Sequence, residues 1–153
     1  CQRCWQQSLI YEILPARLRD LNTLKQLEDE VFKEDAWPVL DILAMLLTPG
    51  MINLKAVHSG EIIGFITVEE KLFDPEASVN SLGVKTSCRR QGVGRALMRA
   101  AEGHIKRKKI RLCVRHSNQA AIDLYFSLGF RKTEVRHNYY PDGEDAYVMR
   151  KIL

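Results

Sequence analysis

Residues 114–130 read VRHSNQAAIDLYFSLGF, and this stretch decides the fold. The alternating pattern of residues 110–115 predicts a strand that leads into it. Asn118 belongs to a residue type that caps helices, and the residues after it predict a helix. That helix ends just before Gly129, a residue type favoured at this position, and residues 130–139 predict a further strand. The stretch therefore predicts a strand, a capped helix and a second strand in quick succession.

A glycine-containing turn precedes this stretch. The residues Arg89-Arg90-Gln91-Gly92-Val93-Gly94 follow a predicted strand and open a helix over residues 94–106. Such a turn aims backbone N–H groups and the positive end of the helix dipole at one phosphate. No Gly-Lys-Ser/Thr follows, which excludes a Walker loop, and the glycine spacing and acidic residue of a dinucleotide-binding fold are absent. The turn indicates a phosphate site, with an ordinary turn before a helix as the alternative.

The rest of the chain predicts one mixed α/β domain over residues 1–153. We find no internal repeat, low-complexity tract or linker. Helices are expected up to about residue 32 and again from Pro38, and strands are expected at residues 9–13, 52–58, 62–69, 78–84 and 146–152.

Length and composition exclude several classes of protein. The chain has 153 residues, 46% hydrophobic and 27% charged, which is a globular mixture rather than a disordered or collagen-like one. The longest apolar run, residues 42–47, is too short to span a membrane, and no secretion signal is visible. We therefore expect no membrane partner. The chain begins at Cys1 rather than Met, as a trimmed or partial chain would.

The net charge of +4 is unevenly distributed. Residues 1–84 carry 7 basic and 13 acidic side chains, whereas residues 85–115 carry 11 basic and 1 acidic. This cationic segment indicates a phosphate-rich cofactor or nucleic acid, or else a solvated basic helix face. No aromatic residue interrupts it, so nucleic acid is the least favoured partner. Its run at residues 106–109 could attract a phosphate or an acidic protein, but we favour a solvated helix end.

The four cysteines show no regular spacing. Cys1-x-x-Cys4 is half of a zinc site without a second half, so we expect no metal. Unpaired cysteines are typical of a reducing compartment, so we expect a cytoplasmic protein.

The glycine turn and residues 114–130 together resemble the GNAT acetyltransferase superfamily. With Asn138-Tyr139-Tyr140 and Glu144-Asp145-Ala146, the chain is similar to the protein N-terminal acetyltransferases, including the ribosomal-protein-alanine (RimI-like) branch. The resemblance covers most of the chain and leaves residues 1–8 outside. It implies a GNAT fold, which is a twisted mixed sheet, mostly antiparallel, of about six to seven strands flanked by about four helices.

The resemblance implies that an amine attacks the thioester of acetyl-CoA directly, without an acyl-enzyme. A protein or peptide N-terminus is the favoured acceptor. Tyr125 takes the general-acid position, where a phenol with a pKa near 10 can protonate the departing thiolate, and a core-facing aromatic is the alternative. The implied cofactor-binding residues are Leu82, Val84, Arg89, Arg90, Gln91, Gly92, Val93, Gly94, Arg95 and Asn118. The implied acceptor-binding residues, each with ordinary core or surface as its alternative, are Phe32, Glu34, Trp37, Tyr139 and Tyr140.

Cys113 departs from the family pattern, because the RimI-like branch carries a glutamate there as general base. A thiol is a poor substitute for a carboxylate. A protein α-amine, with a pKa of about 7.7–8.0, is partly neutral without a base, whereas a lysine amine with a pKa of about 10.4 is not. The departure therefore favours an α-amine acceptor or a base from elsewhere, and Glu34, His137 and Glu144 are the candidates.

Three rival functions remain open at this point. The acceptor could be a small-molecule amine or a lysine side chain. The chain could be a non-catalytic acyl-CoA-binding module, for which the missing glutamate is the best support and the retained Tyr125 the counter-argument. The third rival is a nucleic-acid-binding module, which would rest on the cationic segment alone.

Overall fold

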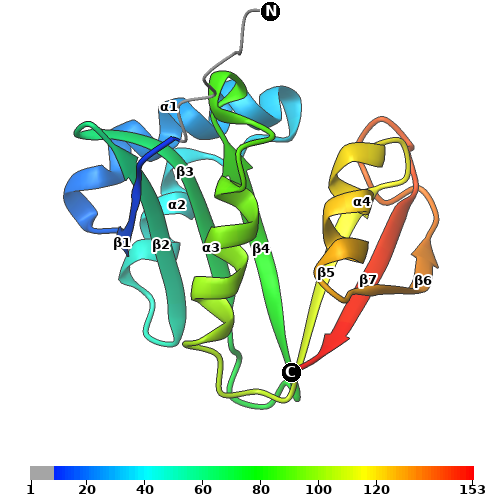
Figure 1. The fold of residues 1–153 in the computed structure, drawn as a ribbon. Helices are drawn as coiled ribbons and strands as arrows, with labels where there is room; N and C mark the ends of the chain where they lie inside the picture. Colours follow the sequence, from blue (N-terminus) through cyan, green and yellow to red (C-terminus); the bar gives the residue numbers. More distant parts are fainter. Residues whose placement is uncertain (1–8) are drawn as a thin grey trace, which may run out of the picture.

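The computed structural model describes residues 9–153, and the Cys1-x-x-Cys4 half-site lies outside them. Seven strands form one sheet within this range, and four α-helices accompany them (Figure 1). The elements in chain order are β1 (Glu12–Pro15), α1 (Leu21–Phe32), α2 (Val39–Leu47), β2 (Met51–His58), β3 (Glu61–Glu69), β4 (Glu76–Val84), α3 (Val93–Glu102), β5 (Lys109–Arg115), α4 (Gln119–Ser127), β6 (Arg131–Arg136) and β7 (Ala146–Ile152). Short 3-10 turns lie at η1 (Leu18–Asp20), η2 (Lys33–Asp35) and η3 (Thr86–Cys88).

The strand order across the sheet is β1-β2-β3-β4-β5-β7-β6. All neighbouring pairs are antiparallel except β4 and β5, so the expected mixed, mostly antiparallel sheet is confirmed. The parallel pairing of β4 with β5 extends only from Glu76–Lys109 to Ser78–Arg111. Figure 1 shows the two strands diverging beyond these residues. The sheet thus opens between the C-terminal halves of β4 and β5.

Helices cover both faces of the sheet. The larger core joins Leu97 of α3 and Ile122 of α4 to the buried side chains of the central strands. A smaller core joins Leu24 and Leu27 of α1 to Phe65 of β3 and to α2. Figure 1 shows α3 and α4 in front of the sheet and α1 and α2 behind it. The opening between β4 and β5 is therefore bordered by α3 and α4 on one face of the sheet and by α1 and α2 on the other.

The capped helix of residues 114–130 forms as expected. Asn118 is the N-cap of α4, and its Oδ1 accepts the N–H of Ala121 at 3.2 Å. Gly129 follows the helix with a φ of +98°, a left-handed conformation in which glycine carries no steric penalty. These contacts fix the start of α4 directly after β5, at the edge of the opening.

The helix expected over residues 94–106 is shorter in the structure. It is α3, which ends at Glu102, because the following chain is held in a turn instead. The carboxylate of Glu70 accepts the N–H groups of Lys106 and Arg107, both at 3.0 Å. Residues 106–108 therefore form a turn that leads into β5, which starts at Lys109, so the basic run does not end a helix. Its three lysines are exposed to solvent, as expected.

Two strands differ from their expected bounds by three residues at one end, and the others by two residues at most. The strand expected at residues 9–13 is β1, which starts at Glu12 because its pairing with β2 begins there. The strand expected at residues 130–139 is β6, which ends at Arg136. Asn138 has a φ of +50° and donates its N–H to Asp145, so the chain turns away from the sheet there. Tyr139 consequently lies in a loop.

Residues 9–153 contain neither a membrane-spanning helix nor a cluster of metal-binding side chains. No helix there is long and apolar enough to cross a bilayer. No three side chains of the metal-binding types His, Cys, Asp and Glu come together there.

Candidate active site

The opening leaves the C-terminal half of β4 with a partner strand on one edge only, among the described residues. Leu82 and Val84 pair with Ile66 and Gly64 of β3 on that edge, while β5 has already diverged. A strand edge without a partner offers N–H and C=O groups to an extended ligand. The two predicted strand residues thus border the opening, on the side where a cofactor arm could pair with them.

A bulge lies just before these residues. Thr67 pairs with Ser81 whereas Val68 pairs with Val79, so Asn80 is an extra residue in β4. A bulge of this kind bends a strand and strengthens its twist. We attribute part of the divergence of β4 from β5 to this bend.

The predicted phosphate loop presents a row of free backbone donors. None of the N–H groups of residues 90–95 has an acceptor among residues 9–153. Arg90 and Gly92 adopt φ angles of +61° and +82°, which turn the loop into the start of α3. Consecutive N–H groups around left-handed residues form an anion-binding concavity, and the dipole of α3 adds to it. The loop therefore fits a diphosphate.

The side chains of the loop mostly brace it. Arg95 donates from Nη2 to Ser127 Oγ at 2.6 Å, which ties α3 to α4, and Arg89 donates from Nε to the carbonyl of Val84 at 3.3 Å. A Cβ on Gly94 would lie 3.4 Å from Leu124 Cδ2, so the start of α3 also packs closely on α4. Arg90 and Gln91 are exposed. The backbone N–H groups consequently remain as donors of this loop that have no acceptor among the described residues.

Asn118 retains a free amide group. Its Oδ1 caps α4, while its Nδ2 makes no hydrogen bond with another described residue. The capping role and the predicted contact with a cofactor arm are thus compatible, because they use different atoms.

Tyr125 lies on the buried side of α4. Its ring packs edge-on against Phe130, with a centroid distance of 5.8 Å. Burial raises the pKa of its phenol to about 12, so the hydroxyl is protonated at any physiological pH. The hydroxyl makes no hydrogen bond with another described residue. Tyr125 is thus a neutral proton donor whose proton has no acceptor among residues 9–153.

Phe32 lies against β4 on the other face of the sheet. Its ring meets Phe65 edge-on, with a centroid distance of 6.5 Å. A Cβ on Gly83 would lie 3.3 Å from Phe32 Cε2 and 2.9 Å from Phe65 Cε1, so only glycine allows this approach. The ring of Phe32 thus sits next to the strand segment formed by Leu82 and Val84.

Trp37 is fixed by α1 through its backbone. Its N–H donates to Glu28 Oε1 at 3.1 Å, and its carbonyl accepts from Lys25 Nζ at 3.0 Å. Its neighbour Glu34 is exposed, and no hydrogen bond or ion pair joins it to another described residue. The predicted acceptor segment is therefore anchored at Phe32 and Trp37 but not at Glu34.

Tyr139 and Tyr140 form an edge-to-face pair in the loop between β6 and β7. Their ring centroids lie 5.0 Å apart with an interplanar angle of 85°. Burial raises the pKa of both hydroxyls, and the adjacent thiol of Cys113 raises both further. Cys113 on β5 therefore lies beside the tyrosine pair, at the position where the resemblance implies a carboxylate.

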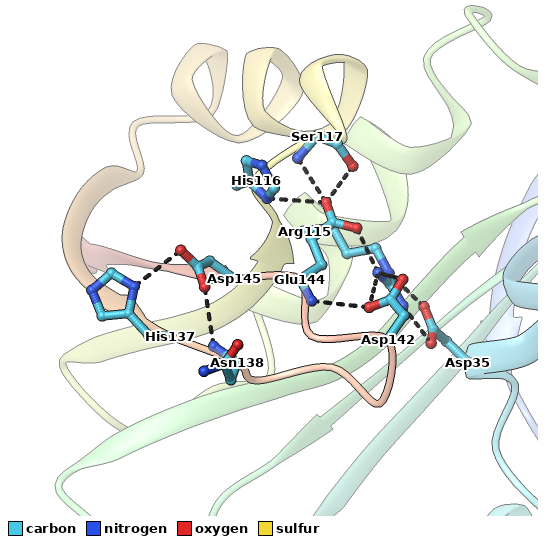
Figure 2. A network of polar contacts seen from close by, with 9 residues as sticks. All are labelled: Asp35, Arg115, His116, Ser117, His137, Asn138, Asp142, Glu144 and Asp145. Atoms are coloured by element: carbon cyan, nitrogen blue, oxygen red, sulfur yellow. Dashed lines mark hydrogen bonds and ion pairs between the residues drawn. The ribbon is translucent and has the colours of Figure 1, made fainter.

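Arg115, at the end of β5, joins the two segments that are predicted to bind the acceptor amine, namely η2 with its flanking residues and the β6–β7 loop (Figure 2). Its guanidinium makes two 2.7 Å hydrogen bonds to Asp35 of η2. It also binds Asp142 at 2.9 Å and Glu144 at 2.6 Å in the β6–β7 loop. Its Cζ lies 4.1 Å from the ring centroid of Tyr140. The carboxylates, Asp35 foremost, raise the pKa of Arg115, so its charge is permanent.

The structure separates the three candidate bases. Glu144 accepts hydrogen bonds from Ser117 and Arg115, which lower its pKa to about 2, so it is a weak base. His137 Nδ1 lies 3.0 Å from Asp145 Oδ2, and the side chain is 77% exposed (Figure 2). A carboxylate fixes the tautomer of such a histidine and leaves Nε2 to accept a proton. His137 lies outside β6, however, which removes the strand face that it was expected to share with Tyr139.

Sequence reasoning missed the residues that hold the site together. Glu28, Asp35 and Asp142 each bind a residue far along the chain. No local pattern marks such long-range pairs. Arg115 lies within residues 114–130, but the sequence did not indicate its partners.

Comparison with known proteins agrees with this geometry. The sequence profile of the acetyltransferase (GNAT) family matches residues 12–130. The N-alpha-acetyltransferase RimI of Mycobacterium tuberculosis is 31% identical over 136 residues, which cover 86% of each protein. The N-terminal acetyltransferase A complex catalytic subunit NAA10 of Arabidopsis thaliana is 34% identical over 71% of this chain, and the match spans 60% of that protein. The crystal structure of the ribosomal-protein-S18-alanine N-acetyltransferase from Escherichia coli superimposes with a TM-score of 0.84, at 30% identity and 94% coverage of both chains.

Proposed function

Because the chain belongs to the acetyltransferase (GNAT) family, whose members use acetyl-CoA, we propose that it acetylates protein N-terminal α-amines. The proposal rests on one observation: beside the opening of the sheet, Arg115 binds both η2 and the β6–β7 loop, the two segments predicted to hold the acceptor amine. Relatives that span most of the chain are named as N-alpha-acetyltransferases, which supports the same acceptor.

The two faces of the opening would each bind one of the two substrates. Residues 90–95, Leu82, Val84 and Asn118 would hold acetyl-CoA on the side of α3 and α4. Phe32, Trp37, Tyr139 and Tyr140 would surround the acceptor on the side of α1 and η2. The amine nitrogen would then form its bond to the thioester carbonyl carbon, and the carbon–sulfur bond would break. The amine proton leaves to solvent or to a base, and the thiolate takes a proton.

Tyr125 would supply the proton to the thiolate. Its burial keeps the phenol neutral, and its hydroxyl has no competing acceptor among the described residues. The ordinary pKa of a phenol, about 10, lies closer to that of a thiol, about 8.5, than the pKa of a carboxylic acid does. Because burial disfavours both the phenolate and the thiolate, the Tyr125 hydroxyl can donate a hydrogen bond to the departing thiolate and share its proton with it.

The absence of a carboxylate at Cys113 supports an α-amine acceptor over a lysine. An α-amine with a pKa of about 7.7–8.0 loses its proton to solvent readily near neutral pH, whereas a lysine amine needs stronger help. Cys88 and Cys113 are free thiols, which supports a cytoplasmic location for this reaction.

The direct test measures CoA thiol release with matched peptides. One set has free N-termini and no lysine, including an alanine-first peptide because one relative is named for ribosomal protein alanine. The other set has blocked N-termini and one internal lysine. Turnover confined to the free N-termini supports the proposal. Turnover confined to the blocked peptides moves the acceptor to lysine, and acetyl-CoA binding without turnover on either set contradicts an N-terminal acetyltransferase.

A further inference from the structure

A second charged surface lies away from the opening. It consists of the β3–β4 turn, Lys71-Leu72-Phe73, and the adjacent basic run at residues 106–109, and we call it the basic tip. Phe73 is 94% exposed and Leu72 is 79% exposed, the highest values among the large hydrophobic side chains of the described residues apart from Ile10. Two protruding apolar side chains beside a run of cations require a physical explanation.

Hydrogen bonds join the two segments of the basic tip. Arg107 donates from Nη2 to the carbonyls of Lys71 and Leu72, at 2.9 and 3.2 Å. Glu70 accepts the N–H groups of Lys106 and Arg107, and the N–H of Asp74 closes the turn on the carbonyl of Lys71 at 3.2 Å. The turn that carries Phe73 and the basic run are therefore one unit, although about thirty residues separate them in the sequence.

The cations of the basic tip are not neutralised by their surroundings. Lys71, Lys106, Lys108 and Lys109 are exposed, and none forms an ion pair within residues 9–153. The nearby acids are already engaged: Glu70 binds backbone N–H groups, and Asp74 binds Arg111 at 2.7 Å. Arg111 also lowers the pKa of Asp74 to about 2, which keeps that pair ionised. Four lysine charges therefore remain available to a partner.

The basic tip lies at the opposite end of α3 from the phosphate loop. The phosphate loop precedes α3, whereas the basic run follows it, so the whole helix lies between them. A helix of ten residues is about 15 Å long. Figure 1 shows the turn after α3 at the bottom of the molecule, near the point where β4 and β5 meet, and the start of α3 nearer the top. The cationic segment of the sequence is thus divided between two sites.

We propose that the basic tip binds single-stranded nucleic acid. Sequence alone argued against such a partner because no aromatic residue interrupts the basic run, but the fold supplies Phe73 from a distant segment. An exposed aromatic ring beside lysines combines a stacking platform for a base with charges for the flanking phosphates. The ring protrudes from the end of a turn instead of lying in a groove, which suits stacking on an unpaired base. The proposal does not depend on the acceptor of the acetyl group.

The test is fluorescence anisotropy with a labelled oligouridylate of about twelve nucleotides, and with the matching oligodeoxyuridylate, which lacks only the 2′-hydroxyls. Four neutralised phosphates predict that affinity falls about 50-fold between about 50 and 200 mM KCl. Phe73→Ala should weaken binding at least about fivefold, the lower end of one stacking contact. Lys106→Glu with Lys108→Glu should weaken binding and flatten the salt dependence. A stronger RNA than DNA signal would identify the 2′-hydroxyl as part of the contact.

The controls use exposed residues elsewhere on the molecule. Leu40→Ala removes an apolar side chain that is 72% exposed on α2, and Arg19→Glu with Lys33→Glu reverses two charges near α1. Neither should change oligonucleotide affinity, and Phe73→Ala should leave acetyl transfer and the melting temperature unchanged. Absence of binding at low salt, or binding unaffected by Phe73→Ala and the lysine pair, overturns the proposal. The wild type could also bind a polyglutamate peptide and no oligonucleotide. If the same variants then lose the peptide, the surface belongs to acidic proteins and the proposal is overturned.

Discussion

Arg115 and Asp35 are 80 residues apart in the sequence, and two hydrogen bonds of 2.7 Å join their side chains. Asp35 lies in the segment between α1 and α2, and Arg115 ends the strand β5. Both side chains are about a quarter exposed, so solvent screens the pair in part. Since Arg115 also binds the loop that carries Tyr140, this pair sets the distance between the two walls of the proposed acceptor site.

Arg115→Lys should damage acceptor binding more than acetyl-CoA binding. A lysine cannot make the two-point contact with Asp35 and the contacts with Asp142 and Glu144 at once, because it lacks the planar fork of arginine. We expect the KM for peptide to rise about tenfold, which corresponds to about 1.4 kcal/mol, and the KM for acetyl-CoA to change little. Asp35→Asn should give a smaller effect in the same direction. A double-mutant cycle that shows no coupling between the two positions would contradict this role.

Tyr125→Phe tests the proposed general acid. The hydroxyl makes no hydrogen bond with another described residue, so its removal should leave the fold and acetyl-CoA affinity intact. Loss of general-acid catalysis should lower kcat by about 10²–10⁴-fold. Tyr147→Phe is the matched control, because Tyr147 is a half-buried tyrosine on β7 that we do not assign to the site. Because burial raises the pKa of Tyr125 to about 12, kcat should show no descending limb from Tyr125 up to about pH 10. Equal kcat values for Tyr125→Phe and the control would remove Tyr125 from the mechanism.

The sequence was sufficient for the local elements and insufficient for the contacts between them. Asn118 and Gly129 marked the ends of α4 correctly, because capping depends on neighbouring residues. Tyr139 was placed on a strand because its residue pattern is strand-like, yet the bond from the Asn138 N–H to Asp145 turns the chain first. The partners of Arg115 depend on how β4 and β5 diverge, and that divergence has no local signature.

Gly83→Ala should disturb the site through packing. A Cβ there would lie 2.9 Å from Phe65 Cε1 and 3.3 Å from Phe32 Cε2, so both rings must move. Overpacking of this size destabilises a protein by about 1–3 kcal/mol. Gly103→Ala is the control, because Gly103 has a helical φ of −65° and its added Cβ would make only an ordinary contact at 3.4 Å. Urea unfolding should show a loss for Gly83→Ala only. Equal stability of the two variants would mean that the rings adjust without cost.

Glu28 is a buried carboxyl group whose ionisation should make the stability of the fold depend on pH. The side chain is 2% exposed, and it accepts hydrogen bonds from Trp37 N–H and from Ser81 Oγ, both at 3.1 Å. Burial raises the pKa of Glu28 above its usual value of 4.5, so the carboxyl favours the protonated state in the folded protein. A raised pKa means that its contribution to stability is complete below about pH 4.5 and is lost as pH rises through the folded pKa.

Glu28→Gln should therefore gain stability relative to the wild type as pH rises. The amide keeps an acceptor for Trp37 and a group that can bond Ser81, but it never ionises. Glu28→Ala should be about 1–3 kcal/mol less stable than Glu28→Gln at every pH, because neither side chain ionises and the alanine leaves the Trp37 N–H and the Ser81 hydroxyl without their buried partner. Urea unfolding of the three proteins at several pH values between about 4 and 8 separates these effects. Parallel stability curves for the wild type and Glu28→Gln would show that Glu28 has the same pKa in the folded and unfolded protein. Burial would then not raise the pKa of Glu28.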